Sequence, residues 1–203
     1  RDMGNGKVRT AGLGMAMQGS CISNLDVGSA TIKLSDDGTY NLIIGAADMG
    51  TGCDTILAQM VAECMDCPVT DVTVFGADTD ASPYDSGSYA SSTTYITGKA
   101  VEKACMELKQ KMATIAAGLL GCGEEEMVFE EGCLKRINTD QKVSLKEIGV
   151  KAQVSNTKSA ESSVSHSSPV SPPPFMVGMV EIELDKLTGE VTILDYMAVV
   201  DCG

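Results

Sequence analysis

The 203-residue sequence lacks Trp altogether, and aromatic residues account for only 4% of it. A core built almost without aromatic rings must be filled by Val, Ile, Leu, Met and Ala. The chain supplies such residues in quantity, since 43% of it is hydrophobic and twelve residues are Met. Methionine is flexible and fills irregular gaps, so we expect an interior that repacks easily.

Basic residues are also scarce, because 15 Lys and Arg face 28 Asp and Glu and leave a net charge of −13. This negative charge argues against nucleic acid and anionic membrane surfaces as partners, since both repel an acidic protein. No apolar run is long enough to cross a bilayer. A bound phosphate group would have to be held by backbone dipoles and hydroxyl groups, because the few basic residues are spread thinly.

Cysteine is plentiful, with eight residues, but its spacing is irregular. Cys64 and Cys67 form a lone CxxC, whereas a zinc site needs a second such pair or a suitably spaced His. The one histidine, His166, lies in a Ser-rich segment and is expected to be solvated. We interpret the cysteines as free, mostly buried thiols in a reducing cytoplasm. For the CxxC we favour packing at a helix end, with a metal or redox role as the alternative.

The stretch 45–55 is the feature around which the rest of the chain is arranged. It follows an apolar strand pattern and precedes a helical pattern that runs from Ile56 to Met65. Gly50 and Gly52 would let the backbone approach a ligand closely, and a helix N-terminus favours an anion such as phosphate. On this interpretation the backbone N–H groups of the loop have no partner within the protein and are open to a ligand. The alternative is that the glycines only form a tight turn between strand and helix.

Hydroxyl-bearing residues cluster between Ser88 and Thr94, where a second helical pattern begins and continues to Leu119. Such a cluster at a helix N-terminus is a second place that favours an anion. The alternative is that these residues only cap the helix and form a polar surface. Upstream, Asp78 and Asp80 could converge on a hard cation, but no further ligands follow at loop spacing, so we favour a solvated turn.

The order of the expected elements predicts the fold class. Alternating residues at 30–34 and 40–44 flank an Asp-Gly turn and predict a hairpin, and a second hairpin is expected from 175–184 and 191–200. The two long helices and a short strand at 71–75 lie between these hairpins. We therefore expect an α+β fold in which the two main helices pack on one face of a mixed β-sheet, in two layers.

The composition changes between residues 154 and 174, where Ser and Pro dominate. We expect this stretch to be an exposed connection between two segments of one domain, 1–153 and 175–203. Residues 1–10 are polar and rich in Gly and are expected to fray. The chain starts at Arg1 and stops directly after a strand pattern, so we expect a fragment of a longer polypeptide.

Several short runs of residues carry a resemblance when they are taken in order. They are Gly45–Thr55, Gln59, Ala62-Glu63, Val72–Val74, Asp78–Asp80, Ala90-Ser91, Gly98–Val101, Val180–Asp185, Thr188-Gly189 and Val200–Gly203. Together they resemble the molybdenum hydroxylases, the family of xanthine dehydrogenase and aldehyde oxidase. No single run is specific, but their order and spacing are. The resemblance covers roughly residues 12–120 and 172–203.

This resemblance implies a partial molybdopterin-binding domain with two cofactor loops. The first loop would be Met49, Gly50, Thr51 and Gly52, and the second Ser88, Tyr89, Ala90, Ser91 and Thr93. The family usually has Gln where this chain has Thr51, and a hydroxyl reaches less far than an amide. The glutamate that serves as the family's general base lies beyond the matched segment. We therefore assign no catalytic residue and no metal ligand in this chain.

The resemblance also implies a function for the full enzyme, which would hydroxylate a purine, another N-heterocycle or an aldehyde. Its cofactor would be molybdenum–molybdopterin in a dinucleotide form, with FAD and [2Fe–2S] clusters on other domains or subunits. We expect a bacterial, cytoplasmic oligomer and an inactive isolated fragment. A non-catalytic assembly module that keeps the fold without the cofactor is the alternative, and an unrelated phosphate-binding α+β domain is a third interpretation.

Overall fold

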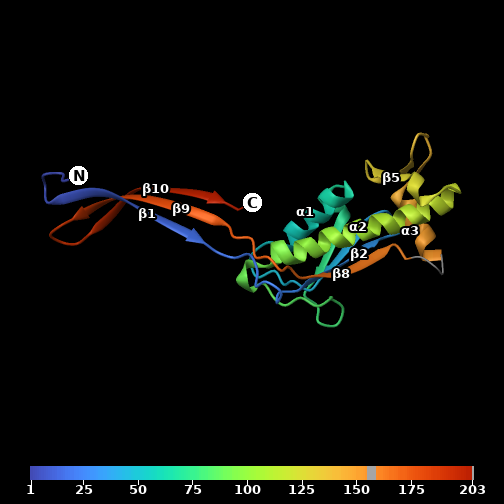
Figure 1. Ribbon diagram of the computed structural model, residues 1–203, viewed down its shortest axis with the longest axis horizontal. Helices are drawn as coiled ribbons and strands as arrows, with labels where there is room; N and C mark the ends of the chain where they lie inside the picture. The colour runs from blue at the N-terminus through green and yellow to red at the C-terminus, as the bar shows by residue number, and fades with distance from the viewer. Residues whose placement is uncertain (155–158, 203) are drawn as a thin grey trace. The chain divides into compact units, whose positions relative to one another are not determined.

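The computed structural model describes residues 1–154 and 159–202 and divides the chain into two compact units (Figure 1). One unit is formed by Arg1–Ser20 with Ser171–Gly203, and the other by Cys21–Val170. Among the described residues there are three α-helices: α1 (Cys53–Met65), α2 (Thr93–Leu120) and α3 (Leu145–Val154). None of these helices is both long and apolar enough to cross a membrane. The mixture of helices and open sheets confirms the α+β class.

The larger unit is built on a four-stranded sheet with the order β4-β3-β2-β8. Its strands are β2 (Gly28–Leu34), β3 (Tyr40–Ile44), β4 (Val72–Gly76) and β8 (Glu161–His166). Strands β2 and β3 form the predicted antiparallel hairpin, and β4 runs parallel to β3 because α1 carries the chain back between them. The sheet is therefore mixed, as expected.

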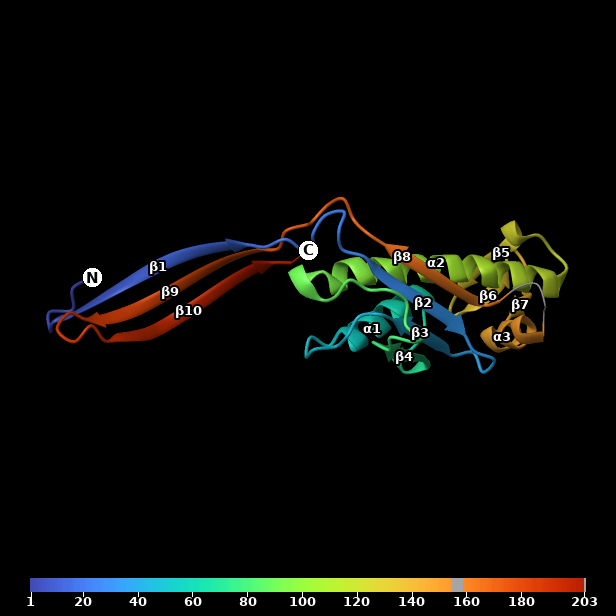
Figure 2. The same ribbon diagram turned by 90° about the horizontal axis from the view of Figure 1, so that it is seen from below.

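Helices α1 and α2 pack on one face of this sheet, which confirms the predicted two layers (Figure 2). Every second residue of β2 and β3 faces them, and each of these side chains is at most 3% exposed. They are Ala30, Ile32, Leu34, Tyr40, Leu42 and Ile44. Leu57, Val61 and Met65 of α1 lie one turn apart and complete the core from the helix side. Among the described residues, Tyr40 thus supplies the one fully buried aromatic ring of this core, in agreement with the composition.

The structure corrects the expectation for the Ser-rich stretch 154–174. Residues 155–158 lie outside the described residues, but 161–166 form strand β8, which pairs with β2 and is no exposed connection. Its inward positions carry Ser162, Val164 and His166, so no apolar alternation marked it as a strand. Serine hydroxyls stabilise it instead, because Ser162 donates to a Glu107 carboxylate oxygen at 2.7 Å. The wider assignment of 1–153 and 175–203 to one domain stays a prediction.

His166 is likewise not simply solvated, because it ends β8 beside α2. Its Nδ1 atom lies 2.9 Å from the Lys103 ammonium nitrogen. Partial burial and the positive charge of Lys103 together lower the pKa of His166. The ring is therefore expected to be neutral near pH 7 and to accept a hydrogen bond from Lys103.

A second sheet at the end of the larger unit contains three short strands, β5 (Met127–Glu130), β6 (Cys133–Arg136) and β7 (Lys142–Val143). Strand β6 pairs antiparallel with both β5 and β7. Helix α3 follows with a capping box, in which the Glu147 carboxylate accepts from the Ser144 backbone N–H at 2.8 Å. The described strands thus form three separate sheets, of which the four-stranded sheet is the mixed one.

The smaller unit is a three-stranded antiparallel sheet with the order β1-β9-β10. Its strands are β1 (Lys7–Met17), β9 (Phe175–Asp185) and β10 (Val191–Asp201). The predicted C-terminal hairpin is confirmed, but it pairs with β1, which begins inside the segment expected to fray. No helix of this unit covers the sheet within the described residues, so Leu13 and Met15 of β1 are 75% and 85% exposed.

The Tyr40 hydroxyl provides a test of the core. It is fully buried and has no hydrogen-bond partner among the described residues. A buried hydroxyl without a partner costs free energy, so we expect Tyr40→Phe to raise the free energy of unfolding by about 1 kcal/mol. Chemical denaturation followed by circular dichroism measures this change. Leu42→Ala, in the same core, should lower the free energy of unfolding by about 3 kcal/mol. A loss of stability in Tyr40→Phe would contradict the assignment.

Candidate functional site

The first loop, residues 45–52, joins the end of β3 to the start of α1. Gly50 and Gly52 have φ angles of 102° and 73°, which favour glycine. The Asp48 carboxylate accepts hydrogen bonds from the backbone N–H groups of Gly50, at 2.9 Å, and Gly52, at 3.1 Å. The expectation that these N–H groups lie bare is therefore wrong. Sequence reasoning missed Asp48, although an Asp two residues before a Gly is a common turn signal.

The carboxylate of Asp48 remains ionised because of these contacts. The N–H groups of Gly50 and Gly52 are the main causes that hold its pKa below the usual range. The first loop therefore contains a built-in negative charge at the N-terminus of α1, where the helix dipole stabilises it. The predicted residues Met49 and Thr51 are exposed on either side of Gly50.

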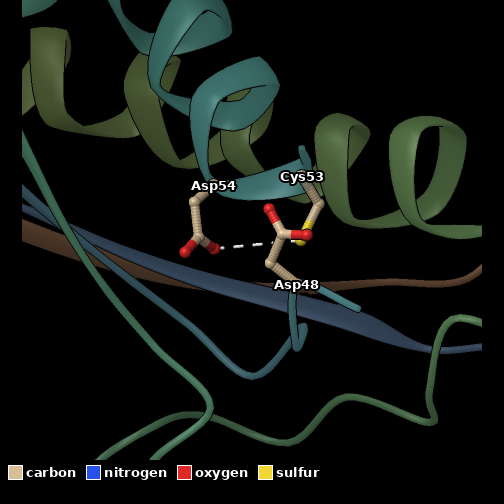
Figure 3. A group of neighbouring side chains, drawn as sticks. All are labelled: Asp48, Cys53 and Asp54. Carbon is tan, nitrogen blue, oxygen red and sulfur yellow. Dashed lines mark hydrogen bonds between the residues drawn. The ribbon is translucent and has the colours of Figure 1, made fainter. Parts of the chain in front are cut away.

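Asp48 lies close to Cys53 and Asp54, and the three side chains form a small cluster (Figure 3). The ligand atoms of the three residues all lie within 4.8 Å of one another. Burial, followed by the charges of Asp54 and Asp48, raises the pKa of the Cys53 thiol, which donates to Asp54 Oδ1 at 3.8 Å. A protonated thiol and a carboxylate already bound to backbone N–H groups are poor metal ligands. The loop geometry thus explains this cluster without a metal.

The second loop, residues 83–92, leads into α2 and is fixed by Asp85. One Asp85 oxygen accepts from the Gly87 backbone N–H, and the other accepts from the buried Thr97 hydroxyl, both at 2.8 Å. Because Gly45 of the first loop has no side chain, the segment that carries Pro83 and Asp85 can lie directly against its backbone. A Cβ atom on Gly45 would lie 2.2 Å from the Pro83 carbonyl oxygen and 2.7 Å from the Asp85 Cβ. Asp85 and Gly45 position the loop, and sequence reasoning assigned neither of them.

The backbone of the second loop is unusual at two residues other than glycine. Ala90 and Ser91 both have positive φ angles, of 51° and 57°, in a short 3-10 turn before α2. Side chains disfavour this left-handed region, and such strain is common at ligand-binding sites. The Thr93 hydroxyl donates to the Ser88 hydroxyl oxygen at 2.9 Å. Tyr89 is 44% exposed.

The two loops share one pocket of about 250 Å³. It is lined by Thr51, Cys53, Ile56, Ser88, Ser91, Thr93 and Thr94. Four predicted site residues, Thr51, Ser88, Ser91 and Thr93, thus meet there. The other five, Met49, Gly50, Gly52, Tyr89 and Ala90, belong to the same loops but do not line it. Three further lining residues, Cys53, Ile56 and Thr94, were not among the predicted site residues. Of these, only Thr94 had a signal in the sequence, because it belongs to the hydroxyl cluster before α2.

The chemistry of the pocket suits a small anion that accepts hydrogen bonds. Its lining contains no Lys or Arg, and its polar groups are mostly hydroxyls. The N-termini of α1 and α2 both lie at its wall, and the helix dipoles supply partial positive charge there. The Asp78–Asp80 turn does not contribute, because the Asp78 carboxylate accepts from the backbone N–H groups of Asp80 and Ala81.

Comparison with known proteins places this geometry in context. A family model described as the molybdopterin cofactor-binding domain matches residues 1–203. The probable hypoxanthine oxidase XdhD of Escherichia coli K12 is 32% identical over 193 residues, which cover 95% of this chain and 20% of that protein. The putative xanthine dehydrogenase molybdenum-binding subunit XdhA of the same strain is also 32% identical, over 88% of this chain and 24% of that protein.

Solved structures show the same fold. The reconstituted CO dehydrogenase from Oligotropha carboxidovorans superposes with a TM-score of 0.87 at 22% identity, over 98% of this chain and 26% of that one. At this identity the likeness establishes the fold alone. The chain spans about a quarter or less of the length of the two curated relatives described above.

The close approach at Gly45 can be tested directly. We expect Gly45→Ala to lower the free energy of unfolding by about 1–3 kcal/mol, because the new methyl group overlaps backbone atoms that cannot rotate away. The NMR signals of 87–91 should also shift as the second loop moves. Gly118→Ala is the control, since its Cβ meets nothing within 4 Å and should stabilise α2 by about 1 kcal/mol. Equal effects of the two variants would contradict the role of Gly45.

The charge on Asp48 gives a pH-dependent prediction. A carboxylate with a lowered pKa contributes stability above its unfolded pKa, and this contribution is lost as the pH falls through the lowered, folded value. The amide NMR shifts of Gly50 and Gly52 should therefore titrate with a midpoint below about 3.9, the ordinary value for Asp. Asp48→Asn should abolish this titration. A midpoint at or above the ordinary value would show that the two N–H groups do not bind the carboxylate in solution.

Proposed function

The chain belongs to the molybdopterin cofactor-binding domain family, and from this premise we propose that it is part of a molybdenum hydroxylase of the xanthine dehydrogenase and aldehyde oxidase type. The whole enzyme would oxidise an electron-poor C–H carbon of a purine, another N-heterocycle or an aldehyde. The hypoxanthine oxidase and xanthine dehydrogenase names of the relatives support this class of substrate. We expect the isolated chain to be inactive, since it spans only a minor part of such proteins.

The observation that carries the proposal is the pocket shared by the two loops. The molybdopterin cofactor carries a phosphate or pyrophosphate group, and this pocket offers hydroxyl donors at the N-termini of two helices. Its volume of about 250 Å³ suits this group but is too small for a whole dinucleotide. The residues present therefore fit the phosphate-bearing part of the cofactor.

Thr51, Ser88, Ser91 and Thr93 would bind and orient this group with their hydroxyls. Met49, Gly50, Gly52, Tyr89 and Ala90 would contact neighbouring parts of the cofactor. Asp48 holds the first loop in shape, and its negative charge would direct a phosphate away from Gly50 and toward Ser91. When bound, the cofactor supplies a metal centre that carries out the redox chemistry. The role of this chain is to position that cofactor, and it contributes no catalytic residue.

The proposal extends to partners of the whole enzyme. We expect FAD and [2Fe–2S] clusters on other domains or subunits, a cytoplasmic location and an oligomeric assembly. The relative named as a molybdenum-binding subunit supports a division of cofactors among chains. A dinucleotide form of the cofactor would extend past the pocket into the solvent-exposed side of the two loops.

A non-catalytic module is the second candidate function. Two observations favour it: Thr51 stands where the family usually has Gln, and the Asp48 carboxylate already binds two N–H groups of the loop. Metal analysis of the full polypeptide would separate the candidates. About one molybdenum per chain supports the enzyme, and a fully folded protein without molybdenum, purified from cells that make the cofactor, supports the module.

Pyrophosphate provides a direct probe of the pocket. We expect millimolar pyrophosphate to shift the amide NMR signals of Cys53, Ser91 and Thr94 in the 203-residue chain, because these residues line the pocket. Ser91→Gly keeps the left-handed backbone but removes the hydroxyl, and should weaken binding about fivefold, a loss of about 1 kcal/mol for one hydrogen bond. Thr114→Ala, on the exposed side of α2, is the matched control and should leave binding unchanged. Shifts confined to residues outside both loops would overturn the assignment.

A further inference from the structure

One face of the three-stranded sheet in the smaller unit is apolar at one end. Residues paired across antiparallel strands point to the same face, so the paired residues of β1 and β9 form one continuous surface there. We name this surface the Met-rich patch, and on these two strands it consists of Leu13, Met15, Met17, Phe175, Val177 and Met179. Met197 of β10 continues it, because it pairs with Met179. Each of these side chains is at least 39% exposed.

The other end of the same face is charged. Lys7 Nζ lies 2.8 Å from Glu183 Oε1, and Arg9 Nε lies 3.7 Å from Glu181 Oε1. Burial of charged groups away from water costs much free energy, whereas burial of the apolar patch is favourable. A partner that covers this face would therefore stop where the charges begin, between Met179 and Glu181.

The opposite face carries no charged residue at any paired position of the three strands. It contains an open trough of about 450 Å³ over Gly12, Gly14 and Gly178, beside Tyr196. A Cβ atom on Gly12 or Gly14 would meet nothing within 4 Å, so packing among the described residues does not require glycine there. Glycine weakens the interior of a strand and often marks a place where another backbone approaches closely. Both faces thus have the composition of a sheet that is covered on two sides.

The number of apolar faces and the length of the relatives identify the occupant. A second copy in a two-fold contact uses one patch on each chain, so it would cover one face and leave the other open. The CO dehydrogenase structure superposes over 98% of this chain, so it contains this sheet, yet this chain covers only 26% of that protein. A polypeptide of that length has enough further segments to cover both faces. Large exposed apolar patches mark such contacts, and flexible Met side chains adapt to a partner.

We propose that both faces of the β1-β9-β10 sheet are docking surfaces for other segments of one longer polypeptide. One apolar segment covers the Met-rich patch up to the charged end, and another lies on the trough over Gly12, Gly14 and Gly178. This proposal rests on the chain being part of a longer enzyme, as proposed above, and it does not depend on cofactor binding. The molybdenum content of the same preparation tests the cofactor role separately.

Oxidation of methionine by hydrogen peroxide, followed by peptide mass spectrometry of the full polypeptide, tests the proposal. If the patch were free, Met15 and Met197 would oxidise at close to the rate measured in the denatured polypeptide. We expect them to oxidise about tenfold more slowly in the native polypeptide, because covered thioethers are shielded from the reagent. Acetylation of Lys7 by acetic anhydride should slow less than about threefold on folding, since an exposed ion pair protects only weakly.

Two results of this experiment would overturn the proposal. One is a slowing at Met15 and Met197 that is no greater than the slowing at Lys7. The other is protection that disappears on dilution, which would identify a second copy as the occupant.

A matched pair of charge substitutions provides a second test in the full polypeptide. Met15→Lys places an ammonium group in the Met-rich patch, and Thr192→Lys places one at the charged end of the same face, opposite Glu183. We expect Met15→Lys to speed limited proteolysis of the sheet about tenfold, because a buried charge without a partner destabilises the docked state. Thr192→Lys should leave the rate unchanged. Equal proteolysis rates for the two variants would contradict the burial of Met15.

Discussion

The close backbone contact at Gly45 is the constraint on which the candidate site depends. Here the end of β3 lies against the segment that carries Pro83 and Asp85, with no room for a side chain between them. Asp85 then ties this segment to α2 through the Thr97 hydroxyl. Because the contact joins the sheet, both loops and the second helix, the pocket is a property of the packed unit. Neither loop forms it alone.

The carboxylate of Asp48 distinguishes the first loop from a simple anion-binding turn, because the loop already contains a negative charge. In such turns bare N–H groups bind the ligand, whereas here Asp48 occupies those of Gly50 and Gly52. The donors that line the pocket are hydroxyls, and two helices begin at its wall. This arrangement is consistent with an acidic chain that has few Lys or Arg to offer. It would favour a ligand bound by many directed hydrogen bonds over one bound by charge alone.

The elements with a strong period were predictable, and the weakly patterned ones were not. Residues 30–44 alternate apolar and polar around an Asp-Gly turn, and α1 repeats its apolar residues every three or four positions, so each pattern has one structural solution. Strand β8 was not predicted, because its buried positions carry Ser162 and Val164 and show no regular apolar alternation. Its place is decided by hydroxyl contacts and by pairing with β2, which are invisible in the local sequence.

By itself, the sequence determined the class of fold, the two glycine- and hydroxyl-rich helix starts and the family to which these belong. Those features are local, since each arises from residues adjacent in the chain, and local preferences act before any packing occurs. The tertiary structure alone decided that Thr51 and Ser91 share one pocket, that Asp48 fills part of the first loop, and that the C-terminal hairpin pairs with β1 in a separate unit. Contacts between distant segments depend on how helices and strands pack, and no short stretch of sequence contains that information.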